Sequence, residues 1–303
     1  ILRDMNGPIS PMTEPSHLRT PDGRSLDLYV AGPDGGGTLV FFHGSPGSGR
    51  LDRPVVEAAA EHGMRTVGWS RPGYGSSTRR EGRNVADVVA DTAAVLDHLG
   101  AESCHVIGWS GGGPHALAVA AMLPDRVRGA ATIGGVAPYP AEGLDWLAGM
   151  GAENVEEFGY SLAGPEAMLP RMDAARAAYV SITGDEVAAA FGDLVDDVDR
   201  ASITGEFAEA VASGFREGLR EGYWGWFDED LMFVQPWGFD LASIRVPVHI
   251  WQGRHDRMVP YAHGEWLASH VPSACPHLSD DHGHLTLVVD SMREIVGELV
   301  AAV

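Results

Sequence analysis

The sequence contains no lysine, so arginine supplies all 21 of its basic side chains other than histidine. Aspartate and glutamate number 42, which gives a formal net charge of −21 at pH 7. A chain this acidic repels nucleic-acid phosphates and anionic lipid surfaces, so we expect neither nucleic acid nor a membrane as a partner. Solubility alone accounts for such a charge, and we attach no further function to it.

Cysteine is also scarce. Cys104 and Cys275 are too few for a disulfide framework or a zinc cluster, and we expect both to be reduced and buried. Without metal-ligand spacings on a predicted helix, we expect no metal and no other cofactor. No stretch approaches 18 consecutive apolar residues, as a membrane-spanning helix requires. Residues 1–20 lack the pattern of a secretory signal, which favours a cytoplasmic location, and the start at Ile1 leaves open whether residues precede it.

Strand-like and helix-like segments alternate along most of the 303 residues. A turn at 21–23 before the alternating stretch 26–30 predicts a hairpin. Apolar runs typical of buried strands occupy 39–42, 64–69, 104–109, 127–133 and 248–251, with a shorter one at 275–279. Helical spacing marks the stretches 55–61, 85–99, 112–122, 261–270 and 285–303. This alternation predicts an α/β fold, a mainly parallel, doubly wound sheet covered by helices on both faces.

Residues 139–239 interrupt this pattern. The segment has no strong strand signal, and it carries 20 of the carboxylates but only 5 arginines. We interpret it as a helical cap inserted into a core that is formed by residues 1–138 and 240–303. Such an insertion is where we expect the substrate to be selected.

The most informative peptide is GWSGGGPH at 108–115, between a predicted strand and a predicted helix. A turn this tight strains the backbone of its central residue, Ser110, and requires small residues two positions away on each side. Gly108 and Gly112 meet that requirement, which matches the G-x-S-x-G nucleophile elbow. We therefore predict Ser110 as the nucleophile.

These residues resemble the α/β-hydrolase fold family, and the resemblance covers nearly the whole chain outside 139–239. FFHGSPG at 41–47 is similar to the family's His-Gly loop, and WSRPGYGSS at 69–77 to its D-x-x-G-x-G-x-S stretch, with Ser70 in place of Asp. The resemblance implies an oxyanion hole formed by the backbone N–H groups of Ser45 and Gly111. It also implies that His43 is a structural loop residue and that Trp109, beside the nucleophile, lines the substrate pocket or fills the core.

The family's order of serine, acid and histidine locates the other two catalytic residues. GRHDRMVP at 253–260 is similar to the family's acid loop and selects Asp256 over Asp228 and Asp240, which precede the strand at 248–251. DDHGHL at 280–285 ends in the Gly-His pair that relatives carry before the final helix, which selects His284 over His282. His255 is a weaker candidate for the base because it is adjacent to the acid.

The resemblance implies a serine hydrolase that cleaves a carboxylic ester of a small molecule through an acyl-enzyme, as a monomer or a homodimer. Haloalkane dehalogenases and epoxide hydrolases of this fold need a carboxylate at the elbow, and Ser110 excludes both. Two alternatives within enzymes stay open. HGSPG at 43–47 is similar to the H-G-G-P-G loop of proline iminopeptidases, although GGG at 111–113 departs from their elbow. A lactone or carbon–carbon bond hydrolase uses the same triad, and a non-catalytic ligand receptor on this fold is the alternative of another class.

Overall fold

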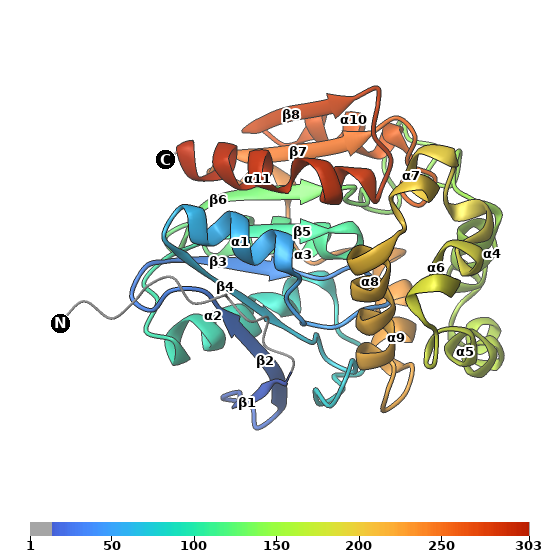
Figure 1. Cartoon of the computed structure of the whole chain (residues 1–303), viewed down its shortest axis with the longest axis horizontal. Coiled ribbons are helices and arrows are strands. Elements are labelled where there is room, and N and C mark those ends of the chain that lie inside the picture. The colour runs from blue at the N-terminus through green and yellow to red at the C-terminus, as the bar shows by residue number, and fades with distance from the viewer. Residues whose placement is uncertain (1–13, 303) are drawn as a thin grey trace.

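A computed structural model describes residues 14–302 of the chain. Residues 1–13, which contain most of the stretch searched for a secretory signal, lie outside the described residues, as does residue 303. The strands form one eight-stranded sheet in the order β1-β2-β4-β3-β5-β6-β7-β8 (Figure 1). Their bounds are Ser16–Arg19 (β1), Ser25–Ala31 (β2), Gly37–Phe42 (β3), Met64–Trp69 (β4), Cys104–Trp109 (β5), Val127–Ile133 (β6), Val248–Gly253 (β7) and Ala274–Ser279 (β8).

Strands β3 to β8 pair in parallel, whereas β1 and β2 are antiparallel to their neighbours. The main helices are Arg53–Glu61 (α1), Val88–His98 (α2), Gly113–Met122 (α3), Ala152–Ala163 (α4), Pro165–Tyr179 (α5), Gly184–Ala190 (α6), Asp197–Ser202 (α7), Gly205–Gly218 (α8), Trp224–Phe233 (α9), Tyr261–His270 (α10) and Thr286–Ala301 (α11). Short 3₁₀ turns occupy Val85–Asp87, Ser110–Gly112, Gly192–Leu194 and Leu241–Ser243.

Helices cover both faces of the sheet (Figure 1). One buried cluster joins α1 and α11 to one face, and a second joins α2, α3 and α10 to the other. Helix α3 is apolar nearly all round and is buried along almost its full length, as expected for a helix between the sheet and its neighbours. The predicted doubly wound sheet and the hairpin at 21–23 are therefore confirmed.

The prediction for the cysteines is correct for Cys104, which is buried, and wrong for Cys275, which is partly exposed. Cys275 lies on β8, the last strand of the sheet, where only one neighbouring strand covers the chain. Within residues 14–302, none of the helices combines the length and the apolar character needed to cross a bilayer.

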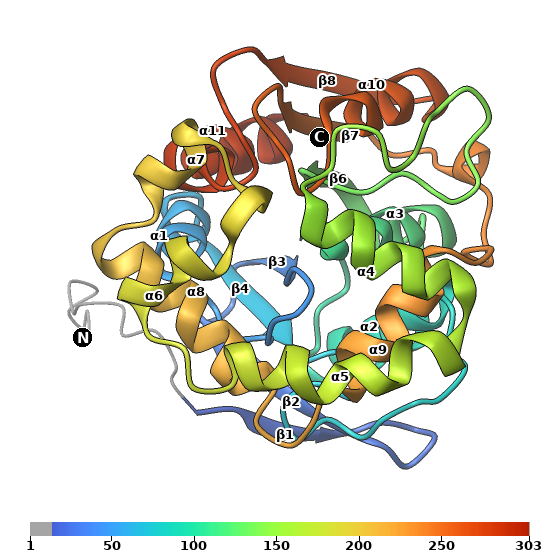
Figure 2. The same ribbon diagram turned by 90° about the vertical axis from the view of Figure 1, so that its right-hand side faces the viewer.

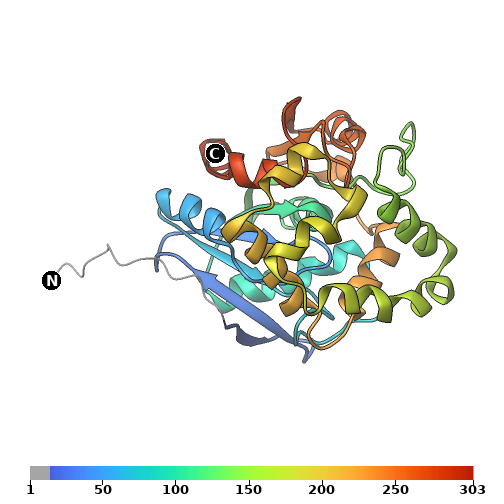
Figure 3. The same cartoon turned by 45° about the vertical axis from the view of Figure 1, so that its right-hand side comes forward.

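Helices α4 to α9 all lie between β6 and β7 in the sequence. They form a layer beyond the carboxyl ends of the parallel strands (Figures 2 and 3). A buried cluster of α6 and α8 side chains includes Leu285, and another of α5 and α9 includes Tyr74. The helical layer thus packs on the edge of the sheet where open α/β folds bind their ligands.

Candidate active site

Ser110 occupies a strained turn between β5 and α3. Its φ of 55° makes it the single non-glycine residue in the left-handed region among residues 14–302. A Cβ atom on Gly108 would lie 2.2 Å from the Gly112 carbonyl oxygen, and one on Gly112 would lie 2.2 Å from the Phe42 carbonyl oxygen. Only glycine fits at either position, so the strand and the helix approach each other closely enough to force the serine into this conformation.

Asp256 and His284 are in direct contact, although they come from loops after different strands. The distance from His284 Nδ1 to Asp256 Oδ2 is 2.7 Å. Asp256 also accepts the backbone N–H groups of Met258 at 2.9 Å and Val259 at 2.7 Å, and the Gln252 amide at 2.9 Å. These bonds hold the carboxylate in one orientation toward the imidazole ring.

The electrostatics of this pair follow from its burial, since Asp256 is 3% exposed and His284 is 1% exposed. Burial raises the pKa of Asp256 above its ordinary value, although the neighbouring imidazole acts in the other direction. For His284, burial disfavours the charged ring, but the Asp256 charge and hydrogen bond outweigh it and raise the pKa above 6.5. The neighbouring carboxylate therefore makes His284 a stronger base than an isolated histidine.

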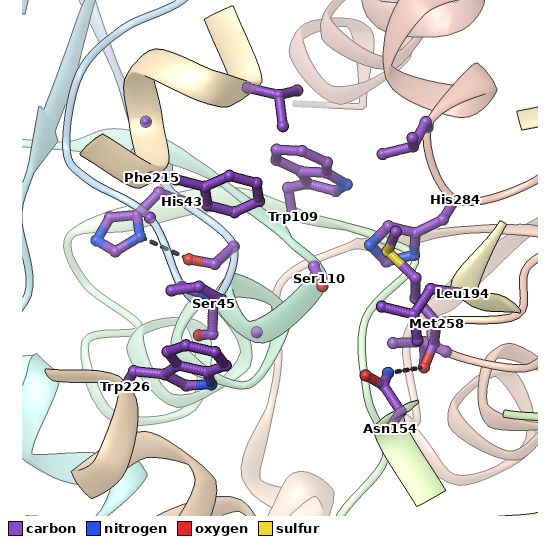
Figure 4. Close-up of a pocket in the computed structure, with 18 of the residues that line it drawn as sticks. His43, Ser45, Trp109, Ser110, Asn154, Leu194, Phe215, Trp226, Met258 and His284 are labelled. Carbon is purple, nitrogen blue, oxygen red and sulfur yellow. Dashed lines mark hydrogen bonds between the residues drawn. The ribbon is translucent and has the colours of Figure 1, made fainter. Parts of the chain in front are cut away.

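Ser110, His284 and Trp109 line one cavity under the helical layer (Figure 4). The cavity has a volume of about 150 Å³. The Trp109 ring centroid lies 5.9 Å from that of His284. Trp109 also contacts the buried clusters of the sheet and of α6 and α8, so it both lines the cavity and contributes to packing.

Ser45 and Gly111 lie against each other beside Ser110. A Cβ atom on Gly111 would come within 2.4 Å of Ser45 Oγ, and one on Gly44 would lie 3.4 Å from Ser110 Cβ. The turn that carries Ser110 and the loop that carries Ser45 are therefore in van der Waals contact at the cavity wall. His43 is buried behind this loop, with Nδ1 2.7 Å from the Gly44 carbonyl oxygen.

A buried ion cluster anchors the Ser45 loop from behind. The Ser45 hydroxyl donates to Glu229, and Arg71 Nη2 lies 3.2 Å from Ser45 Oγ. Arg71 also donates to Glu229 at 2.8 Å and to the His43 carbonyl oxygen at 2.6 Å. Glu229 is fully buried, and Arg83 donates to it at 3.2 Å. Sequence analysis missed this cluster, for which the one signal is the carboxylate run at 228–230 inside an otherwise apolar helix.

Asp199, on α7, is a second carboxylate that sequence analysis missed. It is fully buried, and it accepts the backbone N–H groups of His284 at 2.6 Å, Leu285 at 2.9 Å and Thr286 at 2.9 Å. The Thr286 hydroxyl donates to it at 3.0 Å. A residue of the helical layer thus binds the start of α11, immediately beside the imidazole. Nothing in the local sequence distinguishes Asp199 from its neighbours Asp196 and Asp197.

The alternative candidates from the sequence lie elsewhere. His282 Nδ1 is 2.7 Å from Ser279 Oγ, and His255 Nδ1 is 2.7 Å from Asp196 Oδ2. Asp228 pairs with Arg79 at 2.8 Å. Asp240 accepts the backbone N–H of Ala242 at 2.9 Å. Of the weighed acids and histidines, Asp256 and His284 are the two that the structure brings into contact with each other, and His284 lines the cavity.

Comparison with known proteins gives a consistent family. A family model described as alpha/beta hydrolase fold matches residues 37–291. Epoxide hydrolase B of Mycobacterium tuberculosis is 34% identical over 139 residues, which cover 44% of this chain and 38% of that protein. A 2-hydroxy-6-oxononadienedioate/2-hydroxy-6-oxononatrienedioate hydrolase of Pseudomonas putida is 27% identical over 279 residues, which cover 86% of each chain.

Solved structures agree in fold. A hydrolase from Pseudomonas aeruginosa superposes with a TM-score of 0.68 at 19% identity, over 95% of this chain and 98% of that one. At this identity the likeness concerns the fold alone.

Proposed function

Because the chain belongs to the alpha/beta hydrolase fold family, we propose that it is a serine hydrolase that cleaves a carboxylic ester of a small molecule through an acyl-enzyme intermediate. The observation that carries the proposal is the Asp256–His284 contact of 2.7 Å beside the cavity that Ser110 lines. Residues 139–239 act in this proposal as a cap that encloses the substrate over Ser110.

The proposed reaction begins when Ser110 Oγ attacks the ester carbonyl carbon and His284 Nε2 takes the hydroxyl proton. Asp256 holds Nδ1 and stabilises the imidazolium that forms. The backbone N–H groups of Ser45 and Gly111 stabilise the negative charge that develops on the carbonyl oxygen. The tetrahedral intermediate collapses as the imidazolium protonates the leaving alcohol, which leaves an ester of Ser110.

Hydrolysis of that ester repeats the same steps with water. His284 removes a proton from the water as it attacks the acyl carbon, and the same N–H groups bind the second oxyanion. Collapse of the intermediate releases the carboxylic acid and returns the proton to Ser110. Epoxide opening of the kind named for the Mycobacterium tuberculosis relative is not proposed, because that chemistry needs a carboxylate at the position of Ser110.

Hydrolysis of p-nitrophenyl butyrate and labelling by a fluorophosphonate probe test the proposal. We expect wild type to turn over the ester and to be labelled, and Ser110→Ala to do neither. Ser269→Ala, an exposed serine on α10, is the matched control and should retain both. Turnover that persists in Ser110→Ala would refute the assignment of Ser110 as the nucleophile. A folded wild type that neither turns over esters nor takes the probe would favour the non-catalytic receptor.

A carbon–carbon bond hydrolase is the second candidate, favoured by the Pseudomonas putida relative, which aligns over 86% of both chains. That relative is named for dianionic substrates. The cavity wall here includes Asp52, Glu157 and Asp230, with Arg50 as a single arginine among its lining residues, so a dianion is disfavoured. Wild-type turnover of 2-hydroxy-6-oxononadienedioate faster than that of p-nitrophenyl butyrate would establish this candidate over the ester hydrolase.

A further inference from the structure

Two carboxyl groups from different helices, one partly and one fully buried, meet in the wall of the Ser110 cavity. Glu157 comes from α4 and Asp230 from α9, and both line the cavity. The Trp226 indole N–H donates to Glu157 Oε1 at 2.7 Å, which fixes the first carboxylate. Asp230 is 2% exposed. The two carboxyl groups are near enough for the charge of Glu157 to act on Asp230.

Neither carboxyl group has a basic partner among residues 14–302, in contrast to their neighbours. Asp228 pairs with Arg79 at 2.8 Å, and Glu229 is surrounded by Arg71 and Arg83. Asp230 Oδ2 is buried without any hydrogen-bond donor. A buried carboxylate without a cation is costly, and buried charges in proteins are normally paired.

The unpaired state shows in the pKa values of the pair. Burial, together with the charge of Glu157, raises the pKa of Asp230 well above its ordinary value. Burial also raises the pKa of Glu157. The site thus lacks a positive charge that would favour the ionised form of the two groups.

The rest of the cavity wall suits a cation. Phe158, Tyr179 and Trp226 line it, and aromatic faces attract ammonium groups. Arg50 also lines the cavity, but its charge acts on Asp52, whose pKa burial raises to about 6 against the opposing effect of Arg50.

We propose that Glu157 and Asp230 form a subsite for a protonated amine of the substrate, so that the ester cleaved at Ser110 carries a cationic amino group. The inference rests on the proposed ester hydrolysis and names its substrate class. The ammonium group takes the position of the missing basic partner and donates to the two carboxylates. The helical layer thereby selects substrates by charge as well as by shape.

A pair of isosteric esters tests the subsite without turnover. At neutral pH, 2-(dimethylamino)ethyl butyrate is a cation, whereas 3-methylbutyl butyrate has nearly the same shape and no charge. In calorimetric titrations of Ser110→Ala, we expect the amine ester to bind about tenfold more tightly or better, because a hydrogen bond to a charged group is lost with the neutral ester. Equal affinities, or tighter binding of the neutral ester, would overturn the proposal.

Variants locate the subsite. In the Ser110→Ala background, Glu157→Gln and Asp230→Asn should each bring the ratio of the two affinities toward one. Glu156→Gln is the matched control, since Glu156 lies on the same helix as Glu157 but is exposed and pairs with Arg171 of α5 at 2.9 Å. Fluorophosphonate labelling of the same variants with Ser110 intact reports whether each one folds. A preference that persists in both variants would place the amine elsewhere and overturn the assignment.

Wild-type turnover separates the subsite from the proposed reaction. If wild type hydrolyses both esters and Ser110→Ala binds them with equal affinity, the subsite is contradicted and the ester hydrolase is not. Tighter binding of the amine ester to Ser110→Ala, with neither ester hydrolysed by wild type, supports the subsite and contradicts the ester hydrolase.

Discussion

Asp199 Oδ2 lies 2.6 Å from the backbone nitrogen of His284, so a carboxylate of the helical layer binds the backbone of the proposed catalytic base. The other three donors to this carboxylate are the backbone N–H of Leu285 and both the backbone N–H and the hydroxyl of Thr286. These N–H groups belong to the start of α11, where a negative charge is favourable. The helical layer thus positions the imidazole as well as covering the cavity.

Replacement of Asp199 by Asn should therefore impair both folding and turnover. The carboxylate has two oxygens that accept from four donors, whereas the side-chain amide of asparagine has only one oxygen. Its NH₂ group would face donors that need an acceptor. We expect the free energy of unfolding to fall by about 2 to 4 kcal/mol, as for loss of buried hydrogen bonds to a charged group, measured by urea denaturation. We also expect a lower kcat for p-nitrophenyl butyrate in the folded fraction, because the imidazole loses its fixed position.

Asp197→Asn is the control for this variant, because Asp197 lies on the same helix but is exposed. It should change stability by no more than about 0.5 kcal/mol. Wild-type stability and kcat in Asp199→Asn would show that the loop before α11 holds its conformation without the carboxylate.

A second prediction concerns the pH dependence of turnover. The base must be neutral to accept the Ser110 proton, and the pKa of His284 is raised above 6.5. In wild type, kcat/KM should rise with pH through a midpoint above 6.5. Asp256→Asn removes the charge that raises this pKa and leaves the burial that lowers it, so the midpoint should move to lower pH. The plateau rate should fall by about 10⁴-fold, as when the orienting carboxylate of a serine protease is replaced.

The matched control is Asp280→Asn, which removes an exposed carboxylate of the neighbouring loop and should leave the profile unchanged. A midpoint that stays in place in Asp256→Asn would show that another group governs the acid limb, and the assignment of the acid would fail.

Much of the fold was predictable because it depends on local pattern. Strands Met64–Trp69 and Val127–Ile133 and helix Tyr261–His270 have the bounds that apolar runs and helical spacing predict. The strained turn at Ser110 was predictable because it requires glycine at positions 108 and 112, and these two glycines can be recognised in the sequence. Both features can be predicted from a short stretch of sequence, even where, as at Gly112, the close contact is with the distant Phe42.

The carboxylates of the helical layer were not predictable in this way. Three consecutive carboxylates of α9 have three different surroundings. Asp228 forms a partly exposed ion pair, and Glu229 lies in a buried cluster with Arg71. Asp230 lines the cavity, as does Glu157. Successive residues of a helix point about 100° apart, so their surroundings depend on which distant elements pack on each side. A single sequence contains no pattern that pairs positions 71 and 229.

The third prediction follows from the Glu229 cluster. Glu229→Gln leaves Arg71 and Arg83 buried without their carboxylate, and we expect a loss of about 3 to 5 kcal/mol in the free energy of unfolding at pH 7. Burial disfavours the charged carboxylate, but the two arginines outweigh it and hold the pKa of Glu229 well below 4.5. The folded-state pKa is thus depressed, so the stability that ionised Glu229 contributes is complete above the unfolded pKa and is lost as the pH falls toward the folded one.

The difference between wild type and Glu229→Gln should accordingly shrink as the pH falls below about 4.5. Urea denaturation at pH 7 and at successively lower pH measures it. Glu57→Gln, from an ion pair with Arg53 at the surface, should change stability by no more than about 0.5 kcal/mol at pH 7. A Glu229→Gln protein with wild-type stability at pH 7 would mean that the Ser45 loop does not depend on this charge. Labelling of Ser110 by the fluorophosphonate probe should slow in the folded variant, because the hydroxyl of Ser45 loses its charged acceptor.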